Sequence, residues 1–199
     1  EQVLGENSPV ELTIPGVINQ AHSGLSESFA IRTVTAAGDV IDHSLYGTET
    51  KIMPDMLGAA SVELLSAEAG AMSSVHVSFT LSNPLPANGQ IAIAFPRNLV
   101  LEYPVSNGYL AGIVGMLAVS SYEPEIGGRC PQSDMTPVGC NVTLTVAGDE
   151  TPSGSSVSFG ITNVGLMHIA GFTGTYVLQT RTLEGAVIDE ATVNHSSVA

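Results

Sequence analysis

The sequence repeats itself, without a gap, at an offset of 147 residues. Residues 9–44 align with residues 156–191, and 10 of the 36 aligned positions are identical. The identical pairs are Val10/Val157, Ile14/Ile161, Val17/Val164, Gly24/Gly171, Thr33/Thr180, Thr35/Thr182, Gly38/Gly185, Val40/Val187, Ile41/Ile188 and Asp42/Asp189. Self-similarity at a fixed spacing is the signature of a repeat architecture. We therefore expect an N-terminal partial β repeat over residues 1–50 and a complete unit over residues 51–199.

Alternation of apolar with small or polar residues predicts strands along most of the complete unit. The clearest runs are residues 75–81, 91–95, 143–146 and 157–161, each with a period of two. An Asn-Gly pair at residues 88–89 supplies a turn with positive φ. We therefore predict that the first two runs form a hairpin with one strongly apolar face.

The repeated element itself predicts a hairpin, at residues 29–41 and again at residues 176–188. Gly38 and Gly185 supply a turn conformation that residues with a Cβ resist. The single stretch of helix-like composition has poor apolar spacing, which favours a strand over residues 61–65. Short strands separated by Gly, Pro and Asn turns predict an all-β fold, an Ig-like two-sheet sandwich.

The charge balance excludes several partners. The chain has 5 basic and 19 acidic residues and a net charge of −14, so it cannot present a basic stripe to nucleic acid or to an anionic membrane surface. Residues 109–119 form the longest apolar run, which is too short and too rich in glycine to span a bilayer. Disorder is not expected, because only 12% of the residues are charged.

Cysteines and glycosylation sequons indicate an extracellular location. Cys130 and Cys140 flank a turn-rich loop, and two such isolated, close cysteines favour a local disulfide over free thiols or a metal site. Asn141 and Asn194 each begin a sequon for N-linked glycosylation. We therefore expect covalent glycans, and an oxidising compartment or the cell surface as the protein's location.

The residue types that usually carry out catalysis do not form a catalytic pattern in this sequence. The five histidines are scattered, and none lies in a metal-ligand or nucleophile motif. We expect no catalytic residues, no bound metal and no cofactor, and hence no enzyme. Asp42 and Asp189 recur at equivalent positions. A calcium ligand or a partner contact is one interpretation, and a carboxylate that accepts backbone N–H groups at a strand end is the favoured one.

The segment from Phe79 to Pro96, FTLSNPLPANGQIAIAFP, resembles a motif of tandem β-sandwich repeats in very large extracellular proteins of protists and algae. The downstream segment from Thr173 to Asp189 is similar to the second motif of that family. The resemblance covers residues 61–191 and implies a β-sandwich, with no catalytic residues to carry over. The chain also resembles subunits of glycosylated extracellular filaments found in natural waters.

The partial repeat carries closing strands without the opening strands of its unit. Three such strands cannot bury an apolar face alone, so we expect Leu12, Ile14, Phe29, Ile31, Val40 and Ile41 to form an interface. Either the chain's own body covers them, or a neighbouring subunit does so by strand addition.

The leading hypothesis is a self-assembling, helical filament subunit, which predicts that a chain without residues 1–27 stays soluble and does not polymerise. The alternative is an adhesive or carbohydrate-binding module of a larger cell-surface protein.

Overall fold

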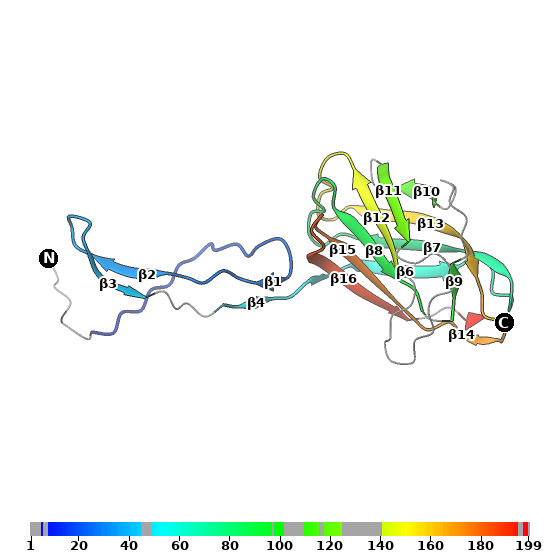
Figure 1. Ribbon diagram of the computed structural model, residues 1–199, viewed down its shortest axis with the longest axis horizontal. Helices are drawn as coiled ribbons and strands as arrows, with labels where there is room; N and C mark the ends of the chain where they lie inside the picture. Colours follow the sequence, from blue (N-terminus) through cyan, green and yellow to red (C-terminus); the bar gives the residue numbers. More distant parts are fainter. Residues whose placement is uncertain are drawn as a thin grey trace.

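The protein consists of a β-sandwich body and a long N-terminal arm that projects from one end of it (Figure 1). The computed structural model describes most of the chain, namely residues 5, 8–44, 49–96, 98–101, 110–115, 118–124, 141–194 and 197–198. All regular elements in these ranges are β-strands, and none of these residues lies in a helix. The all-β prediction is confirmed.

The first sheet of the body has six strands in the order β11-β12-β8-β15-β16-β5. Their bounds are Ala118–Pro124 for β11, Asn141–Ala147 for β12, Gln90–Ala94 for β8, Thr175–Arg181 for β15, Val187–Asn194 for β16 and Asp55–Met56 for β5. All neighbours are antiparallel except β16 and β5, which are parallel. The β15–β16 hairpin therefore lies inside the sheet and is not an exposed edge.

The second sheet has the order β10-β13-β7-β6, with the short strand β9 also paired to β13. The bounds are Leu110–Val114 for β10, Ser156–Gly165 for β13, Met72–Thr80 for β7, Gly58–Leu64 for β6 and Val100–Leu101 for β9. The pair β14 (Gly171–Phe172) and β17 (Ser197–Val198) lies at the end of the body far from the arm (Figure 1). The prediction of a strand over residues 61–65 is confirmed by β6.

The core lies between the two sheets and is built from the alternating residues that the sequence pattern marked. Along β7, Val75, Val77 and Phe79 are buried, while His76 between them is exposed. Buried and more exposed residues alternate in the same way along β13 and β15. The reason is that one side of each strand faces the opposite sheet. The two sheets thus form a sandwich around one apolar layer.

The predicted hairpin of residues 75–81 and 91–95 is wrong, although both strands exist. β7 belongs to the second sheet and β8 to the first, so the two strands face each other across the core. Between them Leu85 is fully buried and forms an isolated bridge with Thr151, and Asn88 has the predicted positive φ, of 61°. Alternation of apolar and polar residues identifies a strand but not the strand with which it pairs. The segment between β7 and β8, which contains Pro84 and Pro86, carries the chain from one sheet to the other.

Tyr176 is the largest fully buried side chain, and its ring packs edge-on against Phe95 with centroids 5.7 Å apart. Burial raises the pKa of the Tyr176 hydroxyl above its ordinary value of 10.0, and the neighbouring Thr173 hydroxyl partly offsets this. Within the described residues the Tyr176 hydroxyl has no partner at full hydrogen-bond geometry. The protein therefore holds this tyrosine in its neutral form.

We predict that Tyr176→Phe leaves the body folded at neutral pH and reduces its loss of stability in alkali. The unfolded chain ionises this tyrosine near pH 10.0, whereas the folded chain does so only at a higher pH. The stability that follows from the raised pKa is therefore present below pH 10.0 and is lost as the pH rises through the folded value. Urea unfolding at pH 7 and about pH 11 measures this, and an unchanged alkaline loss in the variant would contradict it.

Candidate assembly interface

The arm contains two short strand pairs. The distal pair is the hairpin of β2 (Ile31–Val34) and β3 (Val40–Ser44), and the pair nearer the body is β1 (Gly24–Leu25) with β4 (Lys51–Ile52). All residues of β1, β2 and β3 are exposed. The arm does not fold back onto the body (Figure 1), so the body of its own chain does not cover it.

The β2–β3 hairpin has the register of the β15–β16 hairpin. Its Cα partners are Ile31↔Ser44, Arg32↔His43, Thr33↔Asp42 and Val34↔Val40. The repeat equivalents of these eight residues pair as Leu178↔Ala191, Gln179↔Glu190, Thr180↔Asp189 and Arg181↔Val187. Both ladders shift register at the same step, just before the last of these pairs. Over the hairpin, the sequence repeat is therefore a repeat of structure that includes the register shift. The expected third strand of the arm is wrong, because residues 9–18 form no strand whereas their equivalents form β13.

The turns of the two hairpins also match, bond by bond. In the arm, Thr35 donates its backbone N–H to the Asp39 carbonyl at 2.8 Å, and Gly38 donates to the Thr35 carbonyl at 2.9 Å. The equivalent bonds at residues 182–186 measure 2.8 and 3.0 Å. Gly38 has a φ of 93° and Gly185 a φ of 88°, a region that favours glycine. The hairpin thus has the same turn in the arm as in the body.

Asp42 and Asp189 have the same local partner but different surroundings. The Asp42 backbone N–H donates to Thr33 Oγ1 at 3.0 Å, as that of Asp189 does to Thr180 Oγ1, also at 3.0 Å. The carboxylate of Asp189 is fully buried, whereas Asp42 is exposed and accepts a bond from the Thr33 hydroxyl. Asp189 is therefore enclosed by the body, whereas the equivalent Asp42 is open to solvent.

The buried carboxylate of Asp189 holds the loop that follows β7. It accepts the backbone N–H groups of Ser82 and Asn83, each at 3.1 Å, and the Asn83 side-chain amide at 2.8 Å. These residues open the Asn-Pro-Leu-Pro segment that crosses between the sheets. We call this arrangement the Asp189 clamp. The interpretation as an acceptor of backbone N–H groups is confirmed for Asp189, although the residue lies inside β16 and not at a strand end. For Asp42, inside β3, the described donor to the carboxylate is the Thr33 hydroxyl.

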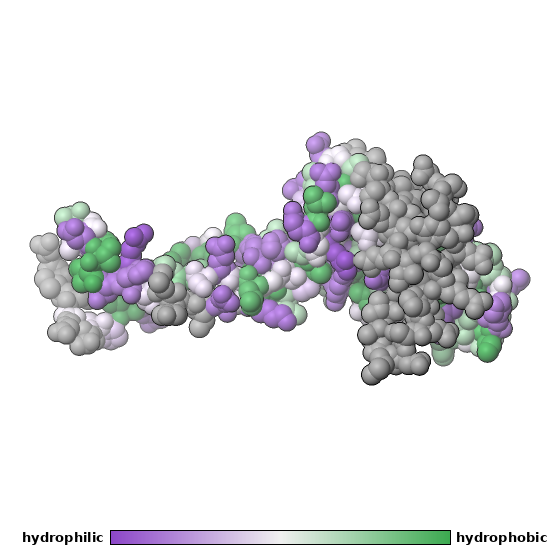
Figure 2. Space-filling view, viewed as in Figure 1, coloured by the Kyte–Doolittle hydropathy of each residue, from purple (hydrophilic) through white to green (hydrophobic). Residues whose placement is uncertain are grey.

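Apolar side chains of the arm are exposed at positions that form the core in the body. Seven of them have exposed fractions of 57–77%, and their seven repeat equivalents have exposed fractions of 0–2%. The pairs are Val10/Val157, Leu12/Phe159, Ile14/Ile161, Val17/Val164, Phe29/Tyr176, Ile31/Leu178 and Ile41/Ile188. Figure 2 shows green, apolar residues along the arm and at its tip. The arm therefore presents apolar side chains of the kind that fill one side of a sandwich core, but here they are exposed to solvent.

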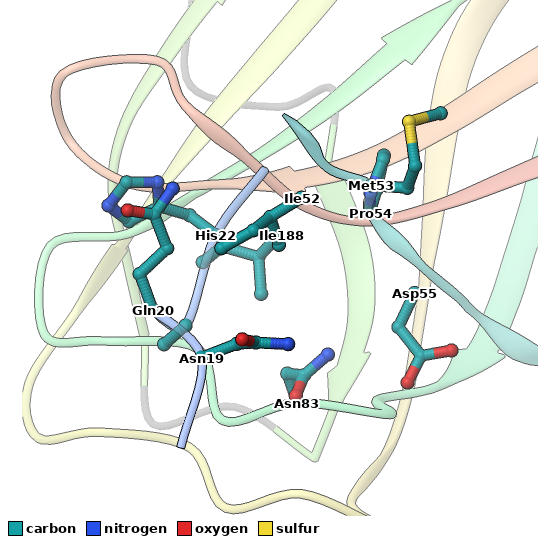
Figure 3. Close-up of a pocket in the computed structure, with 10 residues that line it drawn as sticks. Asn19, Gln20, His22, Ile52, Met53, Pro54, Asp55, Asn83 and Ile188 are labelled. Carbon is teal, nitrogen blue, oxygen red and sulfur yellow. The ribbon is translucent and has the colours of Figure 1, made fainter. Parts of the chain in front are cut away.

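The arm is anchored where it meets the body (Figure 3). The Ser23 backbone N–H donates to the Val187 carbonyl at 2.6 Å, at the start of β16. Beside this bond lies a cavity of about 270 Å³ whose lining includes Gln20, His22 and Asn83. Its polar side chains come from both the arm and the body.

The structure places all the predicted interface residues on the arm, and it adds two exposed residues that the prediction left out. Leu12, Ile14, Phe29, Ile31, Val40 and Ile41 are all exposed there. Val40 differs from the others, because its equivalent Val187 is only half-buried. Val10 and Val17 belong to the same surface, and their identity with two core valines was the signal that could have identified them.

The predicted covalent sites are only partly described. Cys130 and Cys140 lie outside the described residues. Asn141 is the first residue of β12 and is half-buried. Asn194 is the last residue of β16 and is exposed, and it accepts a hydrogen bond from Thr175 Oγ1 at 3.4 Å. Both asparagines therefore lie at strand ends, and Asn194 is the more accessible one.

The described part of the chain contains no group of three or more His, Cys, Asp or Glu residues that could hold a metal ion. In the same part, no helix is long and apolar enough to cross a membrane.

Comparison with known proteins found distant structural likenesses only. No protein-family model and no curated protein matches the chain. The crystal structure of BslA, described as a bacterial hydrophobin, is 15% identical over 74% of this chain and 95% of its own, with a TM-score of 0.36. That of a putative membrane anchored protein from Corynebacterium diphtheriae is 14% identical over 89% of this chain and 45% of its own, with a TM-score of 0.39. These likenesses are too distant to assign a function.

Proposed function

We propose that the protein is the structural subunit of an extracellular, glycosylated filament, and that the arm joins subunits head to tail by β-strand addition or exchange. One observation carries this proposal, namely that seven exposed apolar side chains of the arm repeat seven buried core residues of the body. Burying a large apolar side chain stabilises by about 1.5–3 kcal/mol, so covering the arm is worth on the order of 10 kcal/mol before entropic costs. Such a surface favours a protein partner.

The shape of the molecule supports an open assembly. The arm projects from one end of the body, while the short strand pair β14–β17 lies at the other end (Figure 1). A contact between two different surfaces is heterologous, and it produces a filament unless the rotation closes a ring. The exposed Asn194 at a strand end offers a place for a glycan on the outside of such a filament.

We predict that removal of residues 1–50 abolishes filaments and leaves a folded monomer. The strands of both body sheets lie outside the deleted segment, so the sandwich keeps its core. Electron microscopy of the natively produced protein, with and without the arm, is the measurement. A double substitution, Phe29→Asp with Ile31→Asp, should have the same effect, whereas Leu183→Asp, at an exposed apolar residue of the body, should not.

Filaments that persist without the arm would overturn the proposal. Dispersed 20.5 kDa particles of the chain with its arm would also contradict it and would favour the adhesive or carbohydrate-binding module. Binding of the monomer to a glycan array would then distinguish the second function from a purely structural one.

A further inference from the structure

The end of the body opposite the arm carries a group of exposed apolar side chains. From residue 57 onward, the described part of the chain exposes six large apolar residues, and four of them lie at this end. Leu65 follows β6, Met72 begins β7, and Ile169 and Phe172 lie on the segment after β13 (Figure 1). We call these four residues the end patch. Their exposed fractions are 47–74%, and Figure 2 shows green, apolar residues at this end.

Hydrogen bonds join the two loops that carry the end patch. The Gly70 backbone N–H donates to the Met167 carbonyl at 2.8 Å, and that of Leu166 donates to the Ala71 carbonyl at 3.0 Å. The loops pack so closely that a Cβ at Gly70 would lie 2.8 Å from Nδ1 of His168. The end patch is therefore a preformed surface, which lowers the ordering cost of binding.

The repeat shows that the apolar side chain of Phe172 does not serve the core. The repeat equivalent of Phe172 is Leu25, and the exposed fractions of the two are 66% and 62%. In the seven core pairs, by contrast, the member in the body is buried. Both copies thus have a large apolar residue at a position that neither copy buries. Grouped with three other exposed apolar residues, Phe172 marks an interaction surface.

The end patch is large enough for the apolar part of a specific interface. A large apolar side chain loses about 60–120 Å² of accessible surface when it is buried, so four of them supply on the order of 250–500 Å². A stable interface buries about 800 Å² on each partner, a little over half of it apolar. The arm offers at least as much apolar surface, because seven of its exposed side chains are the equivalents of core residues. Two surfaces of the same chain therefore match in size and in chemistry.

The distal β2–β3 hairpin is the part of the arm best placed to reach another subunit, because it lies far from its own body (Figure 1). Phe29, Ile31 and Ile41 lie on one face of this part of the arm, because their repeat equivalents in the matching hairpin are all buried in the core of the body. The register and the turn bonds fix this face before any contact is made. The hairpin therefore binds with little further ordering.

We propose that the end patch is the acceptor surface for the β2–β3 hairpin of a second copy of this chain, which contacts it through the face that carries Phe29, Ile31 and Ile41. This inference rests on the proposed function and names the acceptor surface that head-to-tail assembly needs. Hairpin and end patch lie at opposite ends of the molecule (Figure 1), so the contact is heterologous and can repeat from subunit to subunit. The acceptor is a closed body whose strands all keep their places, so the contact is an addition and not an exchange.

A mixture of two assembly-deficient variants tests the proposal. The donor-deficient chain carries Phe29→Asp with Ile31→Asp, and the acceptor-deficient chain carries Leu65→Asp with Ile169→Asp. Each variant keeps the surface that the other lacks. We expect each variant alone to remain monomeric. An equimolar mixture should give a one-to-one dimer that does not grow further, because one intact hairpin meets one intact end patch. Sedimentation velocity of the separate and mixed variants is the measurement.

Three controls keep the test independent of folding. Leu65 and Ile169 are exposed, so the urea midpoint of the acceptor-deficient chain should equal that of the natural chain. If this double variant does not fold, Phe172→Asp alone replaces it and should raise the concentration needed for assembly at least about tenfold. Leu183→Asp, at an exposed apolar residue in the turn between β15 and β16, should assemble as the natural chain does.

Two outcomes would overturn the assignment of the acceptor surface. One is a folded acceptor-deficient chain that forms filaments at the same concentration as the natural chain. The other is a mixture in which both folded variants stay monomeric. In either case, loss of filaments on removal of residues 1–50 would preserve the proposed function, and the arm would then bind a different surface. Filaments that persist without the arm would overturn the proposed function together with this inference.

Discussion

Replacement of Asp189 by alanine should lower the free energy of unfolding of the body by about 3–5 kcal/mol. The carboxylate is fully buried and is the acceptor for the Ser82 and Asn83 backbone N–H groups and for the Asn83 side chain. Alanine would leave these donors without their acceptor, and an unsatisfied buried donor costs about 1–3 kcal/mol. The loop that carries the chain from β7 toward β8 would lose its attachment to β16.

Asp42→Ala is the matched control for this prediction. Asp42 has the same place in its hairpin, but its carboxylate is exposed and accepts no bond from the Ser82 loop. We expect a change below about 0.5 kcal/mol for this variant in the unassembled chain. Urea unfolding of both variants, followed by circular dichroism, gives the comparison. If Asp189→Ala prevents folding, Asp189→Asn keeps one acceptor oxygen and should give an intermediate loss.

Equal losses in the two aspartate variants would show that the Asp189 clamp contributes little. The stability of the loop would then come from the fully buried Leu85 and its bridge to Thr151. The pair of variants therefore separates the effect of the clamp from the effect of the hairpin, because the hairpin is present in both parts of the chain.

Leu178→Ala should lower the free energy of unfolding by about 2–5 kcal/mol, the usual cost of truncating a buried leucine. Leu178 lies in the middle of β15 with an exposed fraction of 0%. Its repeat equivalent Ile31 has an exposed fraction of 69%, so Ile31→Ala should change the stability of the monomer by less than about 0.5 kcal/mol. Thermal or urea unfolding of the unassembled protein measures both.

The same pair of variants reports on assembly. If the arm is buried in an assembled form, Ile31→Ala should destabilise that form, because the Ile31 side chain then lies in a core as Leu178 does. We expect Ile31→Ala to raise the concentration needed for assembly while leaving the monomer unchanged. A monomer destabilised equally by both variants would indicate that the arm packs on its own body in solution, contrary to the projecting arm of Figure 1.

Much of the fold could be predicted from local pattern. The alternation of β7, β13 and β15 marked the residues that are buried, and Gly38 and Gly185 marked the two hairpin turns. These features depend on a period of two and on backbone conformations that glycine adopts easily, and both are properties of short segments. The sandwich class followed from them.

The partner of each strand could not be predicted in this way. β7 and β8 follow one another in the sequence and share a turn-rich connection, yet they belong to different sheets. The sequence pattern of a strand is the same whether its neighbour is the next strand or a distant one. The role of Asp189 in holding the loop at Ser82 and Asn83 depends on such a distant pairing, because more than 100 residues separate its ends.

By itself the sequence determined that this chain carries the closing segment of the unit twice, because ungapped identity at a fixed offset needs no structure to be read. It also determined which side chains of that set are apolar. Only the tertiary structure decided that one copy is buried in the body and the other is exposed on an arm. The physical reason is that burial depends on the strands that cover a segment, and among the described residues those strands pair with residues 156–191 and not with the arm.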